Sequence, residues 1–162
     1  MSARLTLVVQ ACGVRRFHMH RVAQAESVGE HSFMVAQLAR ELNQHPALLG
    51  EVLSCALDHD LPEGRAGDIP GHVKHMMSDT FTAFERSVSD EAGLTWKYSV
   101  EVERIVKLAD VMAGYLYCRQ EVVGRGNMAL RGSLYTYQQR AHMYITNDRE
   151  QKVLNFIEGA AV

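Results

Sequence analysis

The stretch Leu57-Asp58-His59-Asp60-Leu61-Pro62-Glu63 places an imidazole and three carboxylates at the end of an apolar run. Residues 48–57 carry leucine, valine and alanine at spacings that put them on one face of a helix. Polar side chains at the rim of a buried face are costly unless something binds them. The pair His59-Asp60 is therefore a candidate metal-binding or catalytic element, although a His-Asp dipeptide on its own is a frequent coincidence.

Two further polar side chains lie within apolar helical patterns. His31 shares a stripe with Val35, Leu38 and Leu42, and Asp110 falls among the apolar positions of residues 102–116. A buried histidine is commonly a core residue with a hydrogen-bond partner, so His31 alone does not indicate a ligand. Together with His59 and Asp60, however, the set offers two imidazoles and two carboxylates. Such donors suit a divalent transition ion held between packed helices.

Residues 14–28 connect the first two expected helices and show no helical period, yet they contain Arg15, Arg16, Phe17 and several histidines. A loop with this composition is a candidate ligand-binding segment. A solvated basic connector explains the same composition, and the residues alone do not separate the two. Glu63 has a comparable alternative, since a glutamate after a proline is commonly solvated.

The elements that must position these side chains are all expected to be helices, because no run alternates like a strand. The chain has 162 residues, is 47% hydrophobic and has no obvious linker, so we predict one all-α domain over residues 1–162. The helices are expected at residues 5–12, 29–43, 46–60, 78–91, 98–120, 128–144 and 149–160. Residues 62–70 are expected to be an irregular connection, and Gly124-Arg125-Gly126 a plain turn.

The overall charge and the cysteines exclude several classes of protein. The formal net charge of −2 gives no basic field, which argues against binding of polymeric nucleic acid. Cys12, Cys55 and Cys118 lack metal-finger spacing and are odd in number, which favours a reducing cytoplasm. No apolar stretch is long enough for a membrane span, and the run Leu5–Val9 is too short for a signal peptide.

The order of these motifs resembles the HD superfamily of metal-dependent phosphohydrolases, whose fold is a helical bundle. Residues 15–17 and 26–32 resemble R-[WF] followed by E-x-V-[SG]-E-H-S. Residues 59–74 resemble H-D-x-x-E-x-x-x-G-D-[IL]-P-x-x-V-K, and residues 106–110 resemble V-K-x-A-D. These are signatures of the 5′-deoxynucleotidase-like branch, and jointly they are highly specific.

The resemblance implies a role for each matching residue. His31, His59, Asp60 and Asp110 would hold one divalent transition ion such as Co, Mn, Zn or Ni. Glu63 would serve as general acid or base, and Asp68 would orient water or the 3′-hydroxyl unless it merely caps a turn. The residues implied in substrate binding are Arg16, Lys74 and Lys107 for phosphate, with Phe17 and Met19 for the base. Solvated surface or plain packing is the alternative for each of these five.

The resemblance also implies a substrate, a 2′-deoxynucleotide hydrolysed at its 5′-phosphoester. The branch includes enzymes for deoxynucleoside monophosphates (dNMPs) and for dATP, which cut the same bond. The spacing of 51 positions from His59 to Asp110 is similar to the compact phage form, so we predict a triphosphohydrolase of the dATP type. A cytoplasmic homo-oligomer is implied as well, in the host cytoplasm if the chain is phage-encoded. A nucleotide sensor without turnover and a structural scaffold are the alternatives; a pure binder would need no general acid or base such as Glu63.

Overall fold

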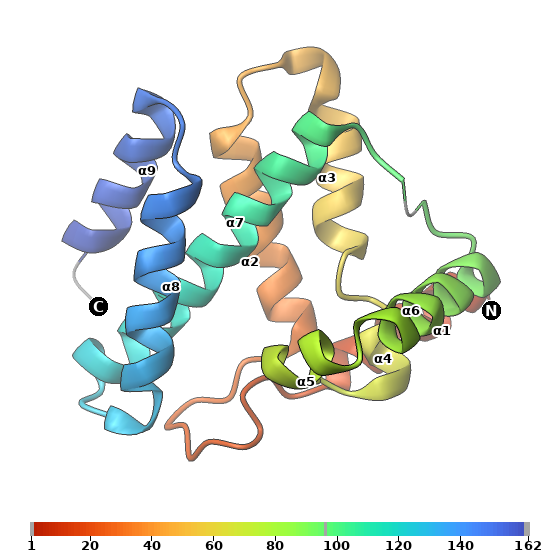
Figure 1. Ribbon diagram of the computed structural model, residues 1–162, viewed down its shortest axis with the longest axis horizontal. Helices are drawn as coiled ribbons and strands as arrows, with labels where there is room; N and C mark the ends of the chain where they lie inside the picture. The colour runs from red at the N-terminus through yellow and green to blue at the C-terminus, as the bar shows by residue number, and fades with distance from the viewer. Residues whose placement is uncertain (1, 96, 161–162) are drawn as a thin grey trace.

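Three helices cross at the centre of the molecule and carry the apolar stripes expected from the sequence. They are α2 (Val28–Leu42), α3 (Leu49–Asp58) and α7 (Val100–Arg119), seen in Figure 1. This computed structural model describes residues 2–95 and 97–160. Fully buried Val35, Val52, Ile105 and Ala109 belong to the core that the three helices share. Because this core fixes the crossing of the three helices, it also fixes any side chain at their contact faces.

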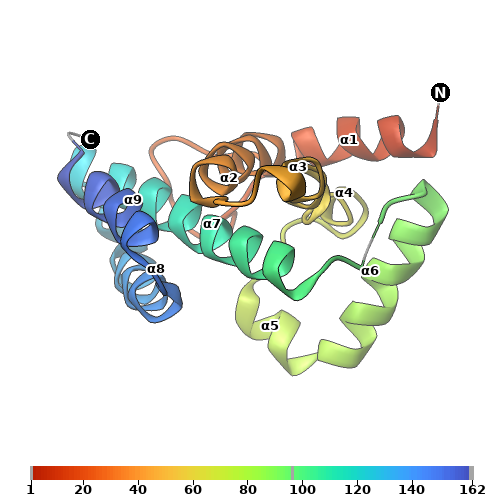
Figure 2. The ribbon, with the colours of Figure 1, turned by 90° about the horizontal axis from the view of Figure 1, so that it is seen from above.

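Two groups of helices flank this centre. On one side, α8 (Arg131–Tyr144) packs along α7 and α9 (Asp148–Gly159) follows it, after a π-helical turn (Gln120–Gly124) and a 3-10 turn (Met128–Leu130). On the other side lie α1 (Ala3–Gly13), α4 (Glu63–Ala66), α5 (Gly71–Met76) and α6 (Ser78–Ala92). Figure 2 shows α5 and α6 as an arm that extends away from the central helices. A second cluster around Leu7 and Val88 joins α6 to α1.

The helices begin where the sequence supplies capping side chains. Ser27 and Glu30 form a reciprocal capping box at α2, and the hydroxyl of Ser99 accepts the Val102 N–H at α7. Asn147 caps α9 in the same manner. At the end of α6, Gly93 adopts a left-handed conformation with φ of 67°, which a glycine does without steric cost.

The prediction of an all-α fold is confirmed, since no β-strand forms within residues 2–95 and 97–160. Two expected boundaries were wrong. The third helix begins as a 3-10 turn at Pro46–Leu48, and residues 62–70 are not wholly irregular because Glu63–Ala66 form a helical turn. In the part of the chain that the structure describes, no helix is both long and apolar enough to cross a membrane.

Residues 15–27 form a loop whose two ends are tied together, and we call this segment the basic loop. Arg15 and Ser27 make an isolated antiparallel bridge, and the Arg16 N–H donates to the Glu26 carbonyl at 2.8 Å. The closed base fixes where the loop leaves the core. In Figure 1 the loop extends from the beginning of α2 into the space between α5 and the beginning of α8.

Candidate active site

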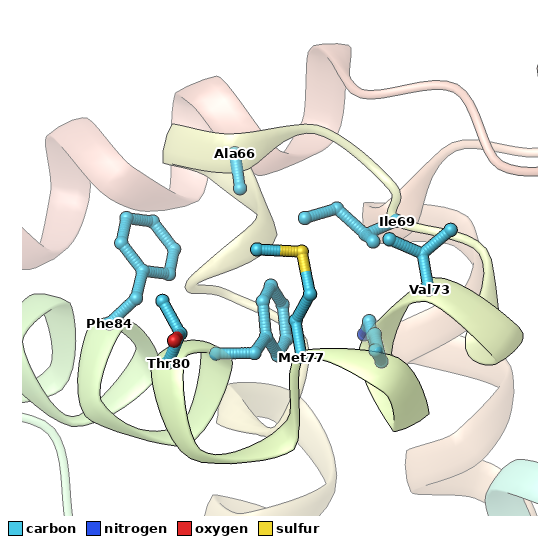
Figure 3. A pocket seen from close by; sticks show the side chains of 8 residues that line it. Ala66, Ile69, Val73, Met77, Thr80 and Phe84 are labelled. Atoms are coloured by element: carbon cyan, nitrogen blue, oxygen red, sulfur yellow. The ribbon is translucent and has the colours of Figure 1, made fainter.

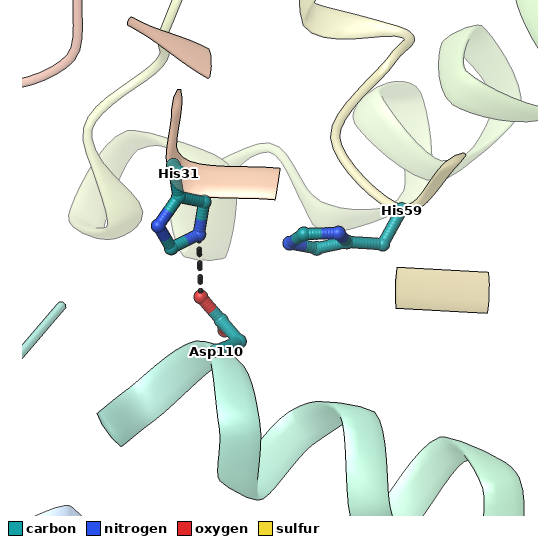
Figure 4. A group of neighbouring side chains, drawn as sticks. All are labelled: His31, His59 and Asp110. Atoms are coloured by element: carbon teal, nitrogen blue, oxygen red, sulfur yellow. Dashed lines mark hydrogen bonds and ion pairs between the residues drawn. The ribbon is translucent and has the colours of Figure 1, made fainter. Parts of the chain in front are cut away.

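The first turn of α2, the end of α3 and the middle of α7 bring His31, His59 and Asp110 together, as Figure 4 shows. One ligand atom from each lies within 4.8 Å of the others, and His31 Nε2 is 3.2 Å from Asp110 Oδ1. His31 is fully buried. The three side chains come from three different helices, so the packing of the core alone determines their geometry.

Asp60, the fourth predicted ligand, faces the same point. Its Oδ2 lies 3.2 Å from His59 Nε2 and 3.6 Å from His31 Nε2. The structure therefore brings together all four predicted donor side chains, although His31 and Asp110 are 79 residues apart along the chain. The buried Nε2 atom of His59 makes no hydrogen bond in the described structure. Once deprotonated, this buried ring nitrogen beside two carboxylates offers a lone pair that fits a divalent cation.

Three of the four groups have the protonation state that a metal ligand needs, and His59 differs. Burial lowers the pKa of His31, which keeps its imidazole neutral. Burial also acts against ionisation of Asp60 and Asp110, but the neighbouring imidazoles lower the pKa of both carboxyls, and the Lys107 ammonium adds to this at Asp110. Burial opposes the charge on His59 too, yet the Asp60 carboxylate raises the pKa of His59 to about 9. In the metal-free protein, His59 therefore carries the positive charge that compensates the two carboxylates.

The hydrogen bonding of His59 selects which ring nitrogen faces the cluster. Its Nδ1 lies 2.8 Å from the carbonyl oxygen of Ala56, one turn earlier on α3. A proton on Nδ1 that donates to this carbonyl leaves Nε2 free to act as a ligand. A partner of this kind is typical of metal-binding histidines, because it fixes both the tautomer and the ring plane.

His59, Asp60 and Asp110 line one wall of a cavity of about 980 Å³, and the fully buried His31 lies behind that wall. All seven other predicted site residues line the same cavity, which places them in one site: Arg16, Phe17, Met19, Glu63, Asp68, Lys74 and Lys107. These seven side chains come from the basic loop, α4, the α4–α5 connection, α5 and α7. The interpretation of the loop as a solvated connector is wrong for Arg16, which is buried and bonds Glu26 at 2.6 Å.

Glu63 is buried rather than solvated, with 3% of its surface exposed. Its Oε1 accepts a hydrogen bond from Lys74 Nζ at 2.5 Å, while its Oε2 has no partner among the described residues. Burial and the nearby Asp60 charge raise the pKa of Glu63 to about 7, although Lys74 opposes the rise. A carboxyl that titrates near neutrality, with one free oxygen, is suited to proton transfer.

Lys74 also lines a second, small apolar cavity of about 230 Å³ between α4, α5 and α6 (Figure 3). Its Nζ lies 5.0 Å from the centre of the Phe81 ring, a cation–π contact. The interpretation of Lys74 as a solvated surface residue is wrong, because its side chain is half-buried and its ammonium group forms an ion pair with Glu63.

Asp68 fixes the conformation of the basic loop. Its Oδ2 accepts the backbone N–H of Phe17 at 2.9 Å, and Phe17 has a φ of 55°, which is rare outside glycine. The Phe17 ring stacks on Tyr117 with ring centres 5.1 Å apart. Neither predicted role of Asp68 includes this contact across 51 residues, although Asp68 also lines the cavity.

Comparison with known proteins places this geometry in a family. A family model described as 5′-deoxynucleotidase YfbR-like matches residues 5–95, which hold three of the four donors and Glu63. This chain belongs to the YfbR-like family of HD phosphohydrolases. Two 5′-deoxynucleotidases of Klebsiella pneumoniae strains are 30% identical over 139 residues, covering 70% of this chain and 70% of each relative. The 5′-deoxynucleotidase of Citrobacter koseri is 29% identical over the same span.

A solved structure shares the fold. The HD phosphohydrolase DatZ of cyanophage S-2L, bound to dA and one catalytic Zn²⁺ ion, superimposes with a TM-score of 0.71 at 19% identity. The match covers 94% of this chain and 92% of the phage chain. The predicted HD-type bundle is confirmed, and the YfbR-like protein described here is a metal-dependent hydrolase.

The sequence interpretation missed one whole wall of the cavity. Helix α8 contributes Ser133, Thr136, Tyr137 and Arg140, none of which carries a recognisable motif. The spacing i, i+3, i+4 and i+7 was the available signal, because it puts the four on one helical face. His18, His20 and His72 also line the cavity, and none of them joins a metal-ligand cluster in the described chain.

Proposed function

We propose that this protein hydrolyses the 5′-phosphoester of 2′-deoxynucleotides, with a deoxynucleoside triphosphate as the main substrate. The supporting observation is the convergence of His31, His59, Asp60 and Asp110, of which the last three line a cavity that cations also line. When bound there, a divalent ion such as Co, Mn, Zn or Ni supplies Lewis-acid chemistry, neutralising phosphate charge and acidifying water. The remaining steps belong to side chains of the protein itself.

Glu63 is the proposed proton-transfer group. In hydrolysis, the oxygen of water bonds to phosphorus, the bond between phosphorus and the 5′-oxygen breaks, and that oxygen takes up a proton. Glu63 Oε2 is free, buried and next to Asp60, so it can exchange this proton with water or the leaving oxygen. Lys74 holds the other oxygen and keeps the carboxyl in one orientation.

The basic loop is proposed to bind the nucleotide. Arg16 is buried at the cavity with its guanidinium anchored by Glu26, so it presents a fixed fork to a phosphate. Phe17 lies beside it, and the exposed Met19 follows at the cavity. Their position favours contact with the sugar and base, although Phe17 already stacks on Tyr117.

Hydrolysis of monophosphates is the second candidate, because the relatives at 29–30% identity are named 5′-deoxynucleotidases. Both substrates contain the bond to be cut, and they differ only in the phosphate groups beyond it. The likeness to DatZ, a phage protein bound to dA, supports a deoxynucleoside as the part that is recognised.

The test is incubation of the protein, loaded in turn with Mn, Co or Zn, with each dNMP and each deoxynucleoside triphosphate (dNTP). Chromatography separates deoxynucleoside, phosphate and triphosphate. Release of deoxynucleoside with intact triphosphate is the expected result, and matching ribonucleotides are the specificity control. Release from monophosphates alone would establish the second candidate. If no nucleotide yields a deoxynucleoside with any of the metals, phosphoester hydrolysis is the wrong reaction.

A further inference from the structure

The α8 wall of the cavity contains a cation that neither the motifs nor the proposed reaction uses. Arg140 is half-buried and lines the same cavity as Asp60 and Lys107. Tyr137 precedes it by one helical turn on the same face. An arginine placed beside a hydrolytic centre, without an assigned role, is a candidate for binding substrate charge.

The packing of α8 on α7 locates Arg140 relative to the metal ligands. A side-chain carbon on Gly114 would come within 2.6 Å of the Tyr137 ring, so Tyr137 lies directly against Gly114. Helix α8 returns along α7 in the opposite direction, as Figure 1 shows. One turn beyond Tyr137 on α8 therefore corresponds to one turn before Gly114 on α7, which is the level of Asp110.

The electrostatics of Tyr137 agree with this placement. Burial raises the pKa of Tyr137 to about 12; the Asp110 carboxylate adds to the rise, while the charges of Arg16 and Arg140 oppose it. Both guanidinium groups thus act on the same hydroxyl. Arg16 and Arg140 also line the same cavity, so one extended anion bound there can contact both.

Each of the three predicted phosphate-binding cations already pairs with a carboxylate of the protein. Arg16 bonds Glu26 at 2.6 Å, Lys74 bonds Glu63 at 2.5 Å, and Lys107 bonds Asp110 at 2.7 Å. Within the described residues, by contrast, no hydrogen bond or ion pair engages the guanidinium of Arg140. Its five donors are therefore available for a phosphate group, which it can bind through two of them at once.

We propose that Arg140 binds the phosphate groups beyond the scissile ester, namely the β- or γ-phosphate of a deoxynucleoside triphosphate. The proposal rests on the proposed function and assigns the residue that distinguishes its two candidate substrates. In this arrangement the single phosphate of a monophosphate contacts only the metal site and Arg16. A triphosphate places about two more negative charges in the cavity, and these need a cation that is not already paired.

The test compares Arg140→Gln with Arg131→Gln, which removes an exposed arginine from the same helix outside the cavity. KM is measured for a dNTP and for the matching dNMP. For Arg140→Gln we expect KM for the dNTP to rise roughly ten- to a hundredfold, as for loss of a charge-assisted hydrogen bond. The ratio of the two KM values should rise with it, while Arg131→Gln leaves both values as in wild type. A rise of equal size for both nucleotides would overturn the proposal.

A second measurement tests the same phosphate site by binding alone, without turnover. Calorimetry with inorganic tripolyphosphate and with orthophosphate reports binding to the metal-loaded protein directly. We expect Arg140→Gln to weaken tripolyphosphate binding much more than orthophosphate binding, and Arg140→Lys to restore part of it. If no nucleotide is hydrolysed but this difference is seen, the proposed function fails and the phosphate site stands. Equal tripolyphosphate affinity in wild type and Arg140→Gln, in protein whose circular dichroism is unchanged, would reject the site even where nucleotides are hydrolysed.

Discussion

The Nζ atom of Lys74 lies 2.5 Å from Oε1 of Glu63, so the proposed proton-transfer group is ion-paired with a lysine eleven residues later. Both residues line the cavity that also contains Asp60. Burial and the Asp60 charge raise the pKa of Glu63 to about 7, and Lys74 limits that rise. The pair therefore sets the pH at which Glu63 exchanges protons.

Replacement of Lys74 by Met removes the cation and keeps most of the side-chain volume. The pKa of Glu63 should rise further, because burial and Asp60 then act without opposition. Whether Glu63 acts as base or as acid, the limb of the kcat/KM profile that reports it moves to higher pH. The control is Arg65→Gln, since Arg65 pairs with Glu91 at the surface. A profile for Lys74→Met with both limbs as in wild type would contradict the coupling.

Glu63→Gln keeps the shape of the side chain and removes its ability to exchange a proton. We expect kcat to fall by roughly 10²–10⁴ while the metal content stays at the wild-type level. Elemental analysis and steady-state kinetics on the same preparation separate the two effects. Loss of the ion would make Glu63 a metal ligand, and nearly normal kcat would leave it without a role in proton transfer.

The central part of the site was predictable from sequence for a physical reason. His31 and Asp110 fall on apolar helical stripes, so their burial follows from the period of the helix. The motif then connected them with His59 and Asp60, and the structure brings all four together. Their assignment as ligands remains a prediction until an ion is measured.

The contacts between distant segments could not be predicted in this way. Glu63 directly follows Pro62 and Lys74 lies four positions after Pro70, so both look like surface residues in the sequence. Only the fold of α4 and α5 brings them together. From the sequence, Arg140 likewise looks like one polar residue among others, because α8 is only weakly amphipathic and its residues that face the site are themselves polar. Helical period identifies buried apolar faces, and it gives no signal for a polar face that lines a cavity.

Asp60→Asn tests the ligand set with the smallest change in volume. It replaces a carboxylate with an amide, which is a weaker ligand for a transition ion. We expect loss of the bound ion and of turnover, with the helical circular dichroism unchanged because the apolar core is untouched. Asp79→Asn, an exposed site on α6, is the control. Full metal content in Asp60→Asn would remove Asp60 from the set.

Metal binding should release one proton at neutral pH, and His59 is its source. Burial opposes the charge on His59, but Asp60, Asp110 and the Ala56 carbonyl together raise its pKa from 6.5 to about 9, so an incoming ion must displace that proton. His31 has none to give, since burial lowers its pKa. The apparent affinity should rise about tenfold per pH unit from neutrality toward pH 9 and level off above it. Calorimetry in buffers of different ionisation enthalpy counts the proton, and an affinity independent of pH over this range would contradict the assignment.

The last prediction concerns Glu121, a fully buried carboxylate in the π-helical turn after α7. It accepts the backbone N–H groups of Ala23 and Gln24 at 2.6 and 3.0 Å and the Asn127 amide at 2.8 Å. The basic loop that carries Arg16 is therefore anchored from a helix about a hundred residues later. Several hydrogen bonds to one carboxylate also lower its pKa despite burial, so the group is ionised at neutral pH.

Glu121→Gln should release this anchor, because an amide cannot accept from all of these donors. Charge-assisted hydrogen bonds contribute about 1.5–3 kcal/mol each, so the population of open loop conformations should rise at least tenfold. Limited trypsin digestion reports this opening through cleavage after Arg21, and the substrate KM should rise more than kcat falls because binding must then order the loop. Glu91→Gln, at the surface, is the control. Cleavage at the wild-type rate, with an unchanged KM, would show that the loop holds its position without Glu121.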